Sequence, residues 1–114
     1  QPMKTIAITV FGTRVSSRLD CAEGVLLVTL DGSIVKNREL VRLVQTNAWE
    51  KINTLLQLGI DVLICGGVPD IYANKLRDSG MQVIPWVRGE AEDVLSNFLA
   101  GKLSKRDTVQ QRRI

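Results

Sequence analysis

The sequence predicts an α/β fold in which a mixed sheet packs against helices. Short β-branched and aliphatic runs recur along the 114 residues, and from residue 47 onward they alternate with segments whose apolar residues recur at helical spacing. An Asp31-Gly32 pair, a strong signal for a two-residue hairpin turn, separates two of the early runs. The expected order is β-β-β-α-β-α-β-α, with a five-stranded sheet in one domain.

Three strands are expected in the first half of the chain. Residues 3–10 are rich in β-branched side chains and predict a buried strand. Residues 24–30 predict a second strand, and the turn at Asp31-Gly32 begins a third, antiparallel strand over 33–37. The apolar residues of 38–46 suit a helix as well as a strand.

Helices and strands alternate in the second half. Asn47 followed by Glu50 resembles a capping box, so a helix should begin there and end at Gly59. Right-handed crossovers should make the later strands parallel to the first. The remaining expected elements are a buried strand over 61–65, a helix from Pro69 to Gly80, a strand over 81–86 and a helix from Gly89 to Gly101.

The net charge of +3 belongs to the end of the chain. Residues 102–114 carry five basic residues and one acidic residue, so the rest of the sequence is close to neutral at −1. We therefore expect a single domain over 3–103 and a basic, flexible tail over 104–114. The charge of the domain itself gives no argument for nucleic-acid binding, which would have to use the tail.

Composition excludes several classes of protein. The chain has no histidine, which excludes Ser-His and Cys-His catalysis and histidine-ligated metal sites. Two cysteines make no disulfide framework, so a reducing, cytoplasmic location is expected. No apolar run approaches the ~20 residues of a membrane span, and no signal peptide is visible.

The first candidate site is the segment 11–22, in which Gly, Ser, Arg and Asp predict a long loop without regular structure. It follows the carboxyl end of the first strand, where open α/β sheets place ligands. Arg14 and Arg18 would neutralise an anionic ligand, and a Cys21 thiolate would coordinate a soft metal. The alternative interpretation is a solvated loop with a small buried cysteine.

The second candidate site is the turn Cys65-Gly66-Gly67, between a predicted strand and a predicted helix. Glycines there would let backbone amides approach a ligand, and the helix N-terminus would favour an anion and a lowered pKa at Cys65. The alternative is a tight turn that needs glycine for its dihedral angles. Cys21 falls near the same edge, but two cysteines cannot complete a zinc site without a carboxylate, a second subunit or ligands on the bound species.

Other residues give weaker signals. Asp31 and Asp61 fall at strand ends and are interpreted as turn residues rather than as ligands of a two-metal nuclease. The pair Ser16-Ser17 has no base to activate it, so a serine nucleophile is not expected. Both tryptophans, Trp49 and Trp86, are interpreted as core residues, although Trp86 follows a strand at the ligand edge.

Several short motifs, in their order and spacing, resemble a known family of small domains. They are Met3-Lys4 with Ile6-Ala7, RLDCA at 18–22, DVLICGG at 61–67, VIPWV at 83–87 with Gly89, and LAGKL at 99–103. Together they are similar to the dinitrogenase iron-molybdenum cofactor biosynthesis family, in its NifX-like and NifB C-terminal-like branches. The similarity covers about residues 3–103, and the basic tail lies outside it.

The resemblance implies a ribonuclease H-like fold and a non-catalytic protein that binds or carries a metal-sulfur cluster or cofactor precursor. An iron-sulfur or molybdenum-iron-sulfur cluster and proteins of cofactor biosynthesis are the implied cofactor and partners. The implied cofactor-binding residues are Arg14, Arg18, Cys21, Cys65, Gly66 and Gly67, with Cys21 and Cys65 as metal ligands.

Some carriers in the family use a histidine to bind their cluster, and this chain has none. Binding of another cluster through cysteine, or no metal at all, therefore stays open. The alternative function is a cofactor-free module of the same fold that binds a protein partner or regulates it.

Overall fold

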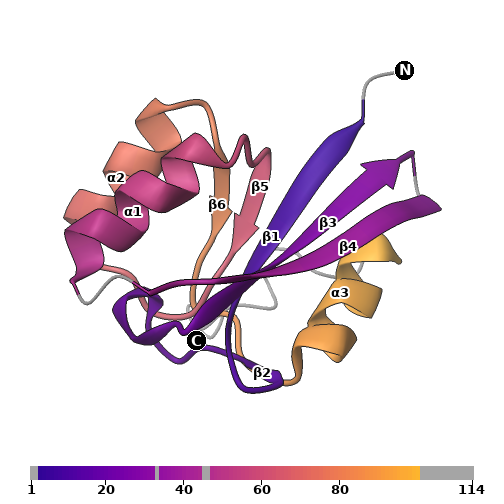
Figure 1. Cartoon of the computed structure of the whole chain (residues 1–114), viewed down its shortest axis with the longest axis horizontal. Helices are drawn as coiled ribbons and strands as arrows, with labels where there is room; N and C mark the ends of the chain where they lie inside the picture. The colour runs from indigo at the N-terminus through magenta and orange to yellow at the C-terminus, as the bar shows by residue number, and fades with distance from the viewer. Residues whose placement is uncertain (1–2, 33, 45–46, 101–114) are drawn as a thin grey trace, which may run out of the picture.

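The described part of the protein forms a six-stranded mixed sheet between two helical layers. The computed structural model describes residues 3–32, 34–44 and 47–100 (Figure 1). The strands are β1 (Lys4–Phe11), β2 (Arg14–Val15), β3 (Gly24–Asp31), β4 (Ile34–Arg42), β5 (Val62–Ile64) and β6 (Gln82–Ile84). The helices are α1 (Ala48–Gln57), α2 (Asp70–Asp78) and α3 (Ala91–Leu99), with a short 3-10 helix, η1 (Leu19–Cys21).

The expected α/β class with a mixed sheet is confirmed, but the expected number of five strands is wrong. The extra strand, β2, lies in the segment 11–22 that was expected to be an irregular loop, and that segment also contains η1. Gly12 has a φ of 66° and follows Phe11, which pairs with Arg14. A glycine with positive φ at the first position of a two-residue turn is typical of a type II′ hairpin, so the chain doubles back onto β1.

The strand order is β4-β3-β1-β5-β6, and β2 pairs with β1 off this path. β3 runs antiparallel to both β1 and β4, whereas β5 is parallel to β1 and to β6, as the crossovers predicted. The ambiguous segment 38–46 continues β4 as far as Arg42, while residues 45–46 lie outside the described part. The carboxyl ends of β1, β5 and β6 therefore meet at one edge of the sheet.

The two faces of β1 build two separate cores. Ile6, Ile8 and Val10 pack with α3, whereas Ala7 packs with α1 and α2 on the opposite face. Side chains alternate between the faces of a strand, so a central strand covered on both sides reads as a nearly continuous apolar run. Figure 1 shows α1 and α2 on one side of the sheet and α3 on the other.

The helix boundaries follow the predicted capping signals closely. The side chain of Asn47 accepts a hydrogen bond from the Glu50 amide (2.9 Å), and α1 ends just before Gly59, whose φ is 70°. Pro69 is the N-cap of α2 rather than its first helical residue. No helix in the described ranges is both long and apolar enough to cross a membrane. The predicted basic tail over 104–114 lies outside the described residues.

Candidate functional site

A cavity of about 290 Å³ opens at the edge of the sheet where the parallel strands end. Three segments line it: one follows β1, one follows β5 and one follows β6. The lining residues are Arg14, Val15, Ser17, Gly66, Gly67, Trp86, Val87, Arg88 and Gly89. Loops at the carboxyl ends of parallel strands are the usual ligand sites of open α/β sheets, so this cavity is the candidate binding site.

Two arginines make the cavity cationic. Arg14 lies 3.6 Å from the Glu90 carboxylate, and both side chains are largely exposed, so solvent weakens this pair. Arg88 is exposed, and within the described residues no carboxylate lies within ion-pair distance of it. Guanidinium groups offer several N–H donors and are weakly hydrated, so both arginines are available to an anionic ligand.

Trp86 borders the cavity in a backbone conformation that is rare for a residue with a side chain. Its φ is 64°, and it is the only non-glycine residue with positive φ in the described part of the chain. Its amide donates to the Gly66 carbonyl (3.0 Å), and the next amide, of Val87, donates to the Cys65 carbonyl (3.0 Å). Such a conformation costs on the order of 1–3 kcal/mol and persists where surrounding contacts impose it.

Neither tryptophan is a core residue, so that interpretation was wrong. The exposed fraction of Trp86 is 47% and that of Trp49 is 45%. The turn after β6 forces Trp86 out of the sheet, and Trp49 lies at the exposed start of α1. The ring of Trp49 instead contacts Tyr72 (6.0 Å between ring centroids) and the ammonium group of Lys75 (5.1 Å) on α2.

Gly66 is a glycine because backbone atoms come too close to admit a Cβ, whereas a Cβ on Gly67 would meet chiefly the Trp86 ring, which is exposed and can shift. A Cβ on Gly66 would lie 2.1 Å from the Ser16 carbonyl oxygen, and one on Gly67 would lie 2.9 Å from the Trp86 ring. Neither glycine has positive φ, so the dihedral argument does not apply to them. The amide of Gly67, which was expected to face a ligand, donates to the Ser17 carbonyl at 2.8 Å.

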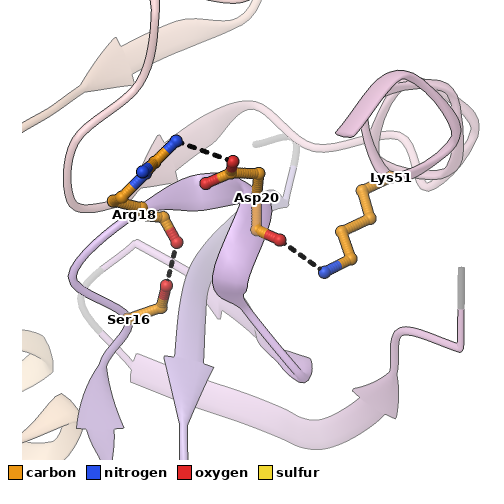
Figure 2. Close-up of polar contacts among 4 residues, drawn as sticks. All are labelled: Ser16, Arg18, Asp20 and Lys51. Carbon is orange, nitrogen blue, oxygen red and sulfur yellow. Dashed lines mark hydrogen bonds and ion pairs between the residues drawn. The ribbon is translucent and has the colours of Figure 1, made fainter. Parts of the chain in front are cut away.

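The segment 16–20 folds back on itself through side-chain contacts (Figure 2). The hydroxyl of Ser16 donates to the Arg18 carbonyl, and the Arg18 guanidinium donates to the Asp20 carboxylate at 2.9 Å. Arg18 is not among the residues that line the cavity, although its backbone bridges to Gly67. Of the two predicted arginines, the structure therefore places only Arg14 at the cavity.

Lys51 is a structural residue that the sequence reasoning missed. Although it is a lysine, only 7% of its surface is exposed, and its ammonium group donates to the carbonyls of Asp20 (2.7 Å) and Ala22 (3.0 Å). Carbonyls at the end of a short helix have no hydrogen-bond donor within that helix. The ammonium group of Lys51, on α1, donates to them instead. The available signal was its spacing: Lys51 lies one turn before Leu55, on the buried face of the helix.

The two cysteines lie in different environments. Cys65 is fully buried in the core shared with α1 and α2, and burial raises the pKa of its thiol to about 12, which the charge of Arg77 offsets only in part. Cys21 is exposed at the end of η1 and is not among the cavity-lining residues. That Cys21 and Cys65 bind one metal together stays a prediction. Their different environments, one exposed and one buried, do not support it.

Protein side chains alone provide no complete metal site in the described part of the chain. No group of three or more His, Cys, Asp or Glu residues there could hold a metal ion. The cavity instead presents guanidinium groups, an indole ring and backbone. These groups can neutralise an anionic ligand and donate hydrogen bonds to it.

Comparisons with known proteins support the fold and leave the function open. No family model matches the chain, and no curated protein does. Among solved structures, the chain is similar to the apo form of the orange protein from Desulfovibrio gigas, with a TM-score of 0.72 and 24% identity over 90% of this chain and 92% of that one. At such identity the likeness shows a shared fold alone.

Two further structures share the fold. A candidate dinitrogenase from Methanocaldococcus jannaschii has a TM-score of 0.73 and 17% identity, over 91% of this chain and 95% of that one. A candidate NifB protein from Thermotoga has a TM-score of 0.71 and 22% identity, over 93% and 96%. Each match covers nearly the whole of both chains, so the fold is shared over its full length.

Proposed function

We propose that this chain binds and carries an anionic metal-sulfur cluster or cofactor precursor without catalysing a reaction on it. The observation that carries the proposal is the cavity at the carboxyl ends of β5 and β6, where Arg14, Arg88 and the ring of Trp86 meet. Sulfide-rich clusters are anionic, and arginine pairs with anions through a weakly hydrated, multiply donating group. The cavity therefore offers charge neutralisation and hydrogen bonds without a protein thiolate.

The structures that share this fold support a link between this chain and cofactor biosynthesis. Proteins described as a dinitrogenase and as NifB share the fold, and the sequence motifs resemble the iron-molybdenum cofactor biosynthesis family. We therefore propose a ribonuclease H-like, NifX-like domain that exchanges its cargo with proteins of cofactor biosynthesis. Its two free cysteines fit the reducing cytoplasm.

Charge rather than thiolate coordination is proposed as the main source of affinity. The Cys65 thiol is buried and holds its proton well above neutral pH, whereas a metal ligand must be the thiolate. Cys21 is exposed, so a cluster that reached the end of η1 would find a thiol there. Arg14 and Arg88 are the residues expected to dominate binding, with Arg18 contributing less because Asp20 holds its guanidinium.

The test uses tetrathiomolybdate as the simplest anion of this class, added to the full chain under anaerobic conditions. Binding is followed by bound molybdenum after gel filtration and by tryptophan fluorescence. We expect Arg14→Gln with Arg88→Gln to weaken binding by about tenfold or more, and raised salt to weaken wild-type binding. Lys36→Gln is the charge-matched control, because Lys36 lies on exposed β4 beside the pair Leu30 and Val35, near the start of β1 and at the opposite end of the sheet from the cavity.

Cysteine and Arg18 variants separate the contributions. Arg18→Gln should weaken binding less than Arg14→Gln, and Cys65→Ser should leave loading unchanged in folded protein. Loading lost only in Cys21→Ser would assign direct coordination to that thiol. Equal binding by the double arginine variant and wild type would refute the proposed site.

A further inference from the structure

The outer edge of β4 is an open strand edge on the opposite side of the sheet from β6 (Figure 1). Within the described residues, no strand pairs with it. Val41 is half-buried, and every other residue of the strand is exposed. A long open edge of this kind is a template for an added strand, and proteins usually protect such edges or use them.

The hydrogen-bond pattern shows which backbone groups are free. The Leu43 amide donates to the Glu23 carbonyl at 2.9 Å, just beyond the pair Arg42 and Gly24. Residues of an antiparallel pair alternate between bonded and non-bonded positions. The amides and carbonyls of Arg38, Leu40 and Arg42 therefore point away from β3 and are available to a new strand.

The side chains at this edge favour an acidic partner. The strand carries three basic residues, Lys36, Arg38 and Arg42, against one acidic residue, Glu39. Arg38 is engaged by Glu92 of α3, which leaves the charge of Arg42 available. A second cavity, of about 180 Å³, is lined by Leu40 and Arg42 together with Val10, Gly12, Glu23 and Gly24.

A second copy of the chain would meet like charges in the central registers of the same edge. Two-fold symmetry about an axis normal to a sheet pairs residues that lie on the same face. A register centred on Arg38 places that residue against Arg38 of the second copy, and one centred on Glu39 places the two glutamates together. A register centred on Leu40 places Arg38 against Arg42 of the second copy. Like charges directly opposite each other destabilise a strand pair. The basic tail of the chain, with five basic residues in 102–114, has the same sign as the edge.

We propose that β4 accepts an extended, acidic segment of another protein as an added antiparallel strand. Backbone hydrogen bonds to Arg38, Leu40 and Arg42 would hold it, and an acidic side chain would pair with the exposed Arg42 guanidinium. The lining of the second cavity, beside Leu40 and Arg42, shares no residue with the arginine cavity, although Val10 pairs with Val15 between the two.

The test measures fluorescence anisotropy of a labelled peptide of about nine residues, with glutamate at alternate positions and threonine or valine between. A matched peptide with lysine in place of glutamate is the control. The full chain should bind the acidic peptide and not the basic one. Leu40→Pro should weaken binding by about tenfold, since it removes an outward N–H without breaking the ladder to β3. Leu40→Thr keeps the N–H and should retain more binding.

Backbone and charge variants distinguish the outcomes. Arg42→Glu should abolish preference for the acidic peptide, and amide NMR shifts should move at Arg38, Leu40 and Arg42. Equal binding of both peptides, or full binding by a folded Leu40→Pro variant, would overturn the proposal. Concentration-dependent dimerisation lost in Leu40→Pro would assign the edge to a second copy. Markedly tighter peptide binding by a chain ending at Ala100 would assign the edge to the tail. Such dimerisation or such tighter binding would also overturn the proposal.

Discussion

The segment 14–22 and the turn 65–67 meet at the same edge of the sheet and each contributes a cysteine, yet the contacts that tolerate least change differ between them. The turn shares backbone hydrogen bonds with the segment through Gly67, and its tightest constraint is steric, because Gly66 admits no Cβ beside the Ser16 carbonyl. The segment is held by polar contacts, chiefly the Lys51 ammonium on two of its carbonyls. One cysteine is consequently a core residue and the other a surface residue, so a shared edge does not imply a shared site.

The largest expected effect is at the steric contact between the two regions. Gly66→Ala would place a Cβ 2.1 Å from a backbone oxygen that cannot rotate away. We expect a loss of about 3 kcal/mol or more in the free energy of unfolding, or failure to fold. Urea unfolding followed by circular dichroism measures it.

The matched control is Gly12→Ala, where a Cβ meets nothing within 4 Å but φ is positive. Only the backbone strain remains there, and its expected cost is about 1–2 kcal/mol. If the two variants lose equal stability, steric contact does not fix the turn.

The second effect tests the polar contacts of the segment. Lys51→Met keeps the length of the side chain but leaves the carbonyls of Asp20 and Ala22 without their donor. Unsatisfied groups of this kind cost about 1–3 kcal/mol, so we expect a loss of about 2 kcal/mol. Amide hydrogen exchange at Cys21 and Ala22 should accelerate, while exchange at β5 should change less.

Lys36→Met on exposed β4 is the control for this change and should alter stability by less than about 0.5 kcal/mol. An unchanged exchange rate at Ala22 in the Lys51 variant would contradict the anchoring role. Lys51→Arg should recover part of the stability, because a guanidinium also donates to carbonyls.

The sequence predicted most of the fold because its signals are local. The cap at Asn47, the hairpin around Gly32 and the apolar run of β5 each depend on neighbouring residues, although the turn was predicted one residue too early, since Asp31 still pairs with Ile34. The extra strand β2 was missed because its evidence is a single glycine turn in a polar segment. A glycine in a polar segment indicates a loop, but the positive φ of Gly12 also suits the turn of a hairpin.

The sequence placed the candidate site at an edge where the structure has a cavity, but it predicted only part of the lining of that cavity. The carboxyl edge, Arg14 and the Gly66-Gly67 turn all line the cavity, since topology brings strand ends together. Side-chain direction and burial depend on contacts distant in sequence. Arg18 is therefore outside the lining, and Trp86 takes its exposed position from hydrogen bonds to the β5 turn.

The smallest effect concerns the buried cysteine and appears only at alkaline pH. The folded state keeps the Cys65 proton until about pH 12, whereas an unfolded thiol loses it near 9.0. Above pH 9 the unfolded state binds fewer protons, so the free energy of unfolding falls as pH rises, by about 1.4 kcal/mol at pH 10 relative to pH 8. Cys65→Ala lacks this titration, so the difference between the two chains isolates it from the titration of lysines. A parallel pH dependence in both would mean that the Cys65 thiol ionises in the folded protein, which would return it to the set of candidate metal ligands.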